Sequence, residues 1–161
     1  MLSRSLCVFC ISDTSLYCRL RQELINVEGY KDVIYADSTK NPTFGIGHKI
    51  TKNDPEFGNP LGTKVSTKRI NEAYDADVKA AINSSCILFK DFQNLPEEVQ
   101  LIILNMRFNL GHTGLDKFEK FRQAVDNRNW VEAASEMEKS NWYKQVPKRA
   151  GKLTERMRTV W

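Results

Sequence analysis

Two carboxylates in the first third of the chain could carry out acid–base chemistry together. Glu28 precedes Gly29, which favours the end of a helix, and Asp37 comes nine residues later. A chain reversal between them would point both carboxyl groups into one cleft. Cleavage of a glycosidic bond needs such a pair, with one carboxyl protonated and the other ionised. A helix-ending Glu and a turn Asp are also common on protein surfaces, so this spacing alone leaves both interpretations open.

The segments around these residues predict the elements that hold them. Apolar residues recur at helical spacing from Leu16 to Val27, so a helix is expected to end at Glu28. Two short alternating runs, at 33–35 and 44–50, flank a polar segment that contains proline. These runs predict a small β-hairpin directly after the helix.

The rest of the chain is helical in pattern. Ser66 can cap a long helix over residues 66–86, and shorter amphipathic runs follow, one of which is expected to close at Gly111. The predicted fold class is therefore α+β and mostly helical. We expect a leading segment of unknown role at 1–18, then one domain at 19–161 that comprises an α+β lobe to about 65, the connecting helix and a helical lobe at 87–161.

Composition excludes several classes of protein. The chain has 161 residues, of which 41% are hydrophobic and 27% charged, as in a folded domain rather than a disordered or collagen-like chain. The longest aliphatic run, Leu101–Leu104, is far too short for a membrane span. Arg4–Ile11 only faintly resembles a signal peptide, so the cellular compartment of the protein stays open. We expect the protein to be a monomer.

The net charge of +4 is concentrated at the C-terminal end. Residues 141–161 contain six Lys or Arg and one Glu, a local charge of +5. Such a segment suits a polyanion: nucleic acid, an anionic membrane or the acidic polymers of a bacterial wall. No nucleic-acid-binding motif accompanies the charge, and a solvated helix face would show the same pattern.

The cysteines do not indicate a metal site. Cys7 and Cys10 form a single C-x-x-C, and no second pair or His pair follows at zinc spacing. The sequence leaves open the redox states of Cys7, Cys10, Cys18 and Cys86. We expect that activity needs no disulfide. No metal or organic cofactor is expected.

A longer motif surrounds the two carboxylates. Residues 28–48 read E-G-x(5)-Y-x-D-x(5)-T-x-G-I-G-H, and further matching segments occur at 77–81, 105–114 and 140–150. Over about residues 20–161 the chain resembles the phage-type (T-even phage-like) lysozymes. The resemblance implies a lysozyme-like two-lobe fold and a muramidase that hydrolyses the β-1,4 link between N-acetylmuramic acid and N-acetylglucosamine in bacterial peptidoglycan.

The resemblance also implies roles for individual residues. Glu28 would be the general acid, Asp37 its partner carboxylate, and Thr43 the hydroxyl that holds the attacking water. This arrangement inverts the anomeric centre. The remaining implied roles are substrate binding by Phe108 and Gly47, a buried Arg149 paired with Glu28, and an ion pair between His48 and Asp77. Three positions of the family's cleft carry different side chains here: Lys49, Phe121 and Glu136.

A lysozyme would have to reach a bacterial wall, either by secretion or by release when a cell lyses. It would serve bacteriolysis or antibacterial defence, and the sequence leaves open whether it belongs to a phage or to a host. The alternative is a cationic antibacterial protein that binds walls or membranes without cleaving them. The combination of Glu28, Asp37 and Thr43 favours the enzyme, because binding alone does not require it.

Overall fold

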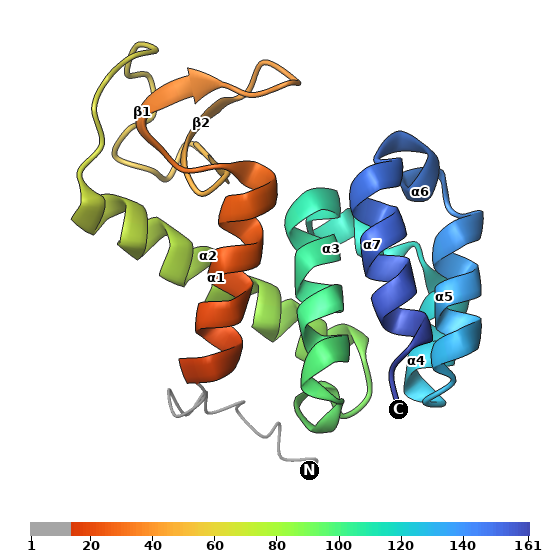
Figure 1. Ribbon diagram of the computed structural model, residues 1–161. Helices are drawn as coiled ribbons and strands as arrows, with labels where there is room; N and C mark the ends of the chain where they lie inside the picture. Colours follow the sequence, from red (N-terminus) through yellow and green to blue (C-terminus); the bar gives the residue numbers. More distant parts are fainter. Residues whose placement is uncertain (1–13) are drawn as a thin grey trace. The chain divides into compact units, whose positions relative to one another are not determined.

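The computed structural model describes residues 14–161 and has the mostly helical α+β fold that the sequence predicts (Figure 1). The residues of the C-x-x-C and of the signal-like segment lie outside the described part. The elements in chain order are α1 (Thr14–Glu28), β1 (Lys31–Ala36), β2 (Pro42–Gly45), β3 (His48–Lys49), α2 (Thr67–Leu88), the 3₁₀ helix η1 (Phe92–Asn94), α3 (Glu97–Asp116), α4 (Glu119–Asp126), α5 (Trp130–Lys139), α6 (Asn141–Gln145) and α7 (Pro147–Arg158).

The chain divides into two compact units. Residues 21–80 form one, called here the sheet unit, and the described residues 14–20 with 81–161 form the other, the helical unit. The division falls inside α1 and inside α2, so each of these helices contributes one end to each unit. No helix in the described part of the chain is long and apolar enough to cross a membrane.

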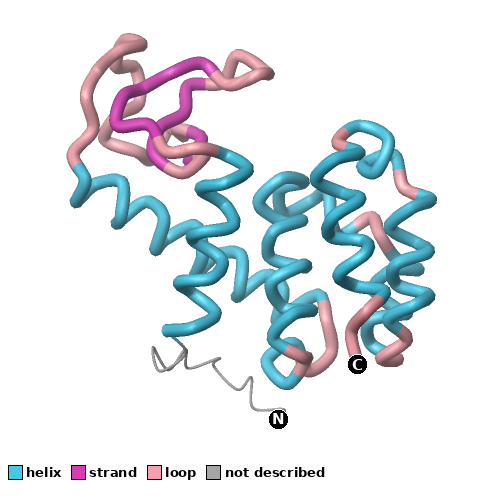
Figure 2. Tube along the Cα trace, in the orientation of Figure 1, coloured by secondary structure: helices cyan, strands magenta, loops and turns pink. Residues whose placement is uncertain are grey.

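The sheet unit contains a three-stranded antiparallel sheet in the order β1-β2-β3 (Figure 2). Tyr35 lies opposite Thr43, and Phe44 lies opposite His48. The predicted hairpin is present, and a third strand extends it because Gly45 and Gly47, with φ of 63° and 67°, turn the chain back on itself. Those left-handed angles suit glycine and explain the G-x-G pattern.

The core of the sheet unit lies between the sheet and the first half of α2. Ile34, Phe44, Val65, Ile70 and Ala73 are buried together. The long loop between β3 and α2 is attached to β1 by backbone hydrogen bonds, among them Gly62 N–H to the Ile34 carbonyl at 2.8 Å. The loop is thereby held to the sheet.

The helical unit is built around α3, whose residues Leu101–Met106 are almost completely buried. α7 packs against α3 and α5 (Figure 1). α3 is interrupted at Gly111 as predicted: with φ of 74° and ψ of 179° this residue is not helical, and a second helical segment follows it to Asp116. Cys18 and Cys86 are thiols, not disulfide partners.

Candidate active site

Glu28 is the last residue of α1, and its side chain is half-buried. Gly29 ends the helix with φ of 81°, while its N–H still donates to the Ile25 carbonyl at 2.9 Å. Gly47 lies against the Glu28 side chain: a Cβ built on this glycine would sit 3.3 Å from Cβ, Cγ and Oε2 of Glu28. The turn between β2 and β3 therefore closely covers the carboxyl group.

Asp37 is held as an ionised carboxylate. Its Oδ1 accepts hydrogen bonds from the backbone N–H groups of Thr39 and Asn41 and from the Thr39 hydroxyl, all at 2.8 Å. The backbone bond from Asn41 contributes most to lowering the pKa of this carboxyl below its ordinary value, with help from Thr39 and Lys49. Oδ2 lies 3.8 Å from the Lys49 ammonium. The Asp37 charge is thus fixed in place at neutral pH.

Thr43 lies in β2 and is 2% exposed. Its hydroxyl donates to the Asn41 carbonyl at 2.9 Å. Because that bond uses the only proton of the hydroxyl, the lone pairs of Oγ1 remain to accept a hydrogen bond from a water molecule. A water held in this way has its own oxygen available for attack.

Tyr35 lies in β1 opposite Thr43, and the motif predicts no role for it. Burial raises the pKa of its phenol, and the negative charges of Glu28 and Asp37 raise it further. The Lys31 ammonium lies over the ring, 4.0 Å from its centroid. A sequence signal for Tyr35 is its position two residues before Asp37, because residues i and i+2 of an extended chain point to the same side.

His48 lies at the start of β3 between two carboxylates. Its Nδ1 is 2.8 Å from Oδ2 of Asp77, the partner that the sequence suggests, and its Nε2 is 3.2 Å from Oδ2 of Asp54. Burial opposes the charged imidazolium, but the carboxylates of Asp77 and Asp54 outweigh burial and raise the pKa of His48 above its ordinary value. Asp54 lies in an irregular loop, where no sequence pattern indicates it.

The helical unit holds the two remaining predicted site residues. Arg149 in α7 donates from Nε to the Asn105 side chain at 2.8 Å and from Nη2 to the Asn105 carbonyl at 3.0 Å. Phe108 is half-buried in α3. The pairing of Arg149 with Glu28 stays a prediction.

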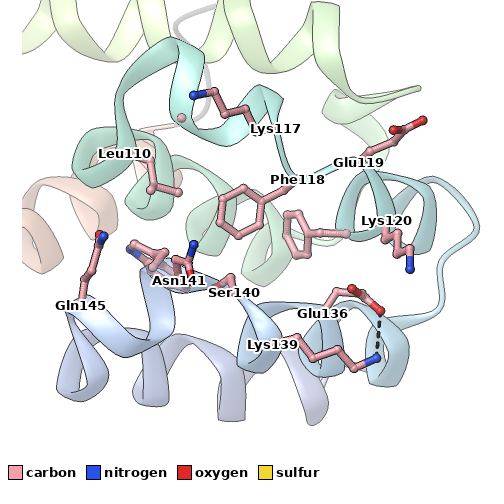
Figure 3. Close-up of a pocket in the computed structure, with 13 residues that line it drawn as sticks. Leu110, Lys117, Phe118, Glu119, Lys120, Glu136, Lys139, Ser140, Asn141 and Gln145 are labelled. Carbon is pink, nitrogen blue, oxygen red and sulfur yellow. Dashed lines mark hydrogen bonds and ion pairs between the residues drawn. The ribbon is translucent and has the colours of Figure 1, made fainter.

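The helical unit also contains an open pocket of about 630 Å³ (Figure 3). Phe121 and Glu136, two of the positions that depart from the family's cleft, lie in its wall, and Lys139 pairs with Glu136 at 3.0 Å. Trp142, which donates from Nε1 to the Asn109 side chain at 2.7 Å, forms part of the same wall. Leu110, Gly114, Lys117, Phe118, Glu119, Lys120, Ser140, Asn141 and Gln145 complete the lining.

Residues 14–161 contain no group of three or more His, Cys, Asp or Glu side chains arranged to hold a metal ion. The sheet unit holds three groups suited to acid–base chemistry: a carboxyl beneath a tight turn, a fixed carboxylate and a hydroxyl with free lone pairs.

Comparison with known proteins agrees with this chemistry. The chain is 32% identical to probable T4-type lysozyme 2 of Dictyostelium discoideum, over 78% of this chain and 85% of that protein. It is 28% identical to probable T4-type lysozyme 1 of the same organism, with the same coverage, and 28% identical to the pre-baseplate central spike protein Gp5 of Enterobacteria phage T4, of which it covers 25%. The Phage lysozyme family matches residues 25–159. The chain therefore belongs to the phage lysozyme family of glycoside hydrolases.

Proposed function

We propose that this lysozyme-family hydrolase cleaves the β-1,4 bond between N-acetylmuramic acid and N-acetylglucosamine in bacterial peptidoglycan, with inversion at the anomeric carbon. The observation that carries the proposal is geometric: Gly47 packs against the Glu28 side chain, while Thr43 lies in the adjoining strand opposite Tyr35, two residues before the fixed Asp37 carboxylate. This arrangement supports a general acid, a fixed negative charge and a water-binding hydroxyl in one unit of the fold.

Each residue has a distinct task in the proposed reaction. Glu28 donates its proton to the glycosidic oxygen as the bond to the anomeric carbon breaks. Asp37, ionised by its three hydrogen bonds, stabilises the positive charge that develops on the sugar ring. A water that donates one hydrogen bond to Oγ1 of Thr43 attacks the opposite face of the sugar and transfers a proton to the Asp37 carboxylate, which acts as the general base; exchange with solvent then returns Glu28 and Asp37 to their starting protonation states.

Other residues of the proposal bind substrate or support these groups. Gly47 leaves room at the turn beside Glu28, and Phe108 supplies an aromatic face for a sugar. Arg149 would stabilise the ionised form of Glu28 after it has given up its proton. The biological outcome that we propose is bacteriolysis, which would serve infection or antibacterial defence.

The direct test replaces Glu28 with Gln, which has nearly the same shape but cannot donate an acidic proton. We expect the variant to fold normally and to release reducing ends from purified peptidoglycan at least about 10² to 10⁴ times more slowly than the wild type, because general acid catalysis contributes about that much. Glu72→Gln, an exposed position of α2, is the matched control and should hydrolyse at the wild-type rate.

Two outcomes would refute the proposal. Hydrolysis by Glu28→Gln close to the wild-type rate would remove the general acid role. Killing of bacteria by Glu28→Gln at wild-type efficiency would refute bacteriolysis by hydrolysis as the biological outcome and would favour the non-catalytic cationic protein.

A further inference from the structure

The turn that covers Glu28 has very little room on either side. Gly47 faces the Glu28 side chain, and Gly45 faces α2, where an added Cβ would lie 2.8 Å from Cγ2 of Ile70. The backbone of the turn is therefore confined between α2 and the carboxyl-bearing side chain. Any movement of this turn must change the surroundings of Glu28.

His48 directly follows the turn and is fixed in position and orientation. Its side chain is 13% exposed, its ring contacts Phe44 with centroids 4.9 Å apart, and its two nitrogens face Asp77 and Asp54. The protonated ring donates from Nδ1 to Asp77 at 2.8 Å, whereas Nε2 faces Asp54 at an ion-pair distance of 3.2 Å without the geometry of a hydrogen bond. His48 is thereby tied to α2 through Asp77 and to the loop after β3 through Asp54.

Asp54 is in turn held by several donors. Its Oδ2 accepts from the backbone N–H of Thr51 at 2.7 Å and from the Thr51 hydroxyl at 3.0 Å. Its Oδ1 accepts from Nη2 of Arg69 in α2 at 3.0 Å. The Asp54 carboxylate thus joins His48 to Arg69.

Arg69 completes the network through Glu56. Its Nε donates to Oε1 of Glu56 at 2.6 Å and its Nη2 donates to Oε2 at 3.1 Å, in the two-pronged geometry that only a guanidinium provides. Glu56 is 9% exposed, and the Arg69 guanidinium also lies over the Phe44 ring, 5.5 Å from its centroid. These contacts are partly buried, so they constrain geometry more strongly than fully exposed ion pairs do.

We propose that Asp54 and Arg69 are positioning residues for Glu28: they fix His48, His48 fixes the Gly45–Gly47 turn, and the turn fixes the carboxyl group. This inference rests on the proposed role of Glu28 as general acid. Proton donation depends on accurate placement of the acid, and a displacement of about 1 Å can lower the rate about 100-fold. Both residues lie outside the motif of residues 28–48.

The principal test is Asp54→Asn. Asparagine keeps the size of the side chain and can still accept hydrogen bonds from Thr51, but it removes the charge that faces His48 and Arg69. On soluble glycan strands we expect kcat to fall about tenfold while KM changes by less than about twofold, because orientation rather than binding is lost. The kcat–pH profile should also change, because Asp54 is one of the groups that raise the pKa of the His48 ring beside the turn.

The matched control is Asp32→Asn, an exposed aspartate on β1 of the same unit. It should retain the wild-type kcat, KM and pH profile. Thermal unfolding of each variant establishes that the assay temperature lies below its transition. If Asp54→Asn does not fold, the comparison of Arg69→Lys with Arg69→Gln carries the same test, since Lys keeps the cation and should restore part of the kcat that Gln loses.

A double-mutant cycle with Gly47→Ala tests the route through the turn. If Asp54 acts on Glu28 through this turn, then Asp54→Asn should lower kcat only a little further in a protein whose turn Gly47→Ala has already displaced. Losses of kcat that multiply in the double variant would overturn the proposed route.

The positioning role and the general acid role fail in different ways. If folded Asp54→Asn shows the wild-type kcat and pH profile, the positioning role is overturned. The proposed function would still be supported in that case, provided that Glu28→Gln is inactive. An active Glu28→Gln would refute the proposed function whatever Asp54→Asn does.

Discussion

At the scale of single residues, the two carboxyl groups of this site have different surroundings. Asp37 has three donors on one oxygen and stays ionised, whereas Glu28 lies under the backbone of a glycine turn. Different environments for two like groups are what acid catalysis with a stabilising carboxylate requires. The motif includes Tyr35 but predicts no role for it, because an aromatic residue in a strand is more often core.

His48 gives a prediction for the pH dependence of stability. Its pKa is raised in the folded protein, so its contribution to stability is complete below the ordinary value of 6.5 and is lost as pH rises through the folded value. We therefore expect the melting temperature to fall between about pH 6 and pH 9, and the fall to be smaller in His48→Gln. Calorimetry at several pH values measures this.

Asp77→Asn provides the partner variant for that measurement. Loss of one charged hydrogen-bond partner should destabilise the protein by about 1 to 3 kcal/mol at pH 6 and by less at pH 9. A melting temperature that rises across this range in the wild type, or a fall that His48→Gln leaves unchanged, would show that His48 does not carry the effect.

At the scale of elements, periodicity predicts the long helices well and the short connections poorly. α1 ends at Glu28 and α2 covers Thr67–Leu88, close to the predicted 66–86, because a buried apolar face repeats over several turns in each. The third strand depends on the backbone angles of Gly45 and Gly47, which have no periodic signature, whereas the break in α3 falls at the predicted Gly111. The loop that brings Asp54 and Glu56 to Arg69 is fixed by tertiary contacts, so its role could not be predicted from local pattern.

At the scale of the whole molecule, the structure refines the interpretation of the basic C-terminal end. Arg156 pairs with Glu98, and Arg158 pairs with Glu138 and Glu155, so these charges are locally compensated. Lys144, Lys148 and Lys152 are exposed and follow one another at intervals of four residues along α6 and α7. They are the side chains best placed to attract an anionic wall.

Replacement of these three lysines by Gln should slow the lysis of intact bacteria at low ionic strength. Added salt should slow the wild type in the same way, because the screening length falls from about 10 Å at 0.1 M to about 3 Å at 1 M. Hydrolysis of a short neutral saccharide should barely change in either case. Equal salt sensitivity on cells and on the saccharide would mean that ions act on the site or the fold instead of on recruitment.

The stereochemistry of the first product tests the central claim most directly. If Glu28 protonates the leaving oxygen while a water held by Thr43 attacks the opposite face, cleavage of a β-linked glycan must release the α-anomer first. Proton NMR of a digest, recorded before mutarotation equilibrates the two anomers, distinguishes them. The account predicts the α-anomer at the earliest times, and the β-anomer appearing first would contradict it.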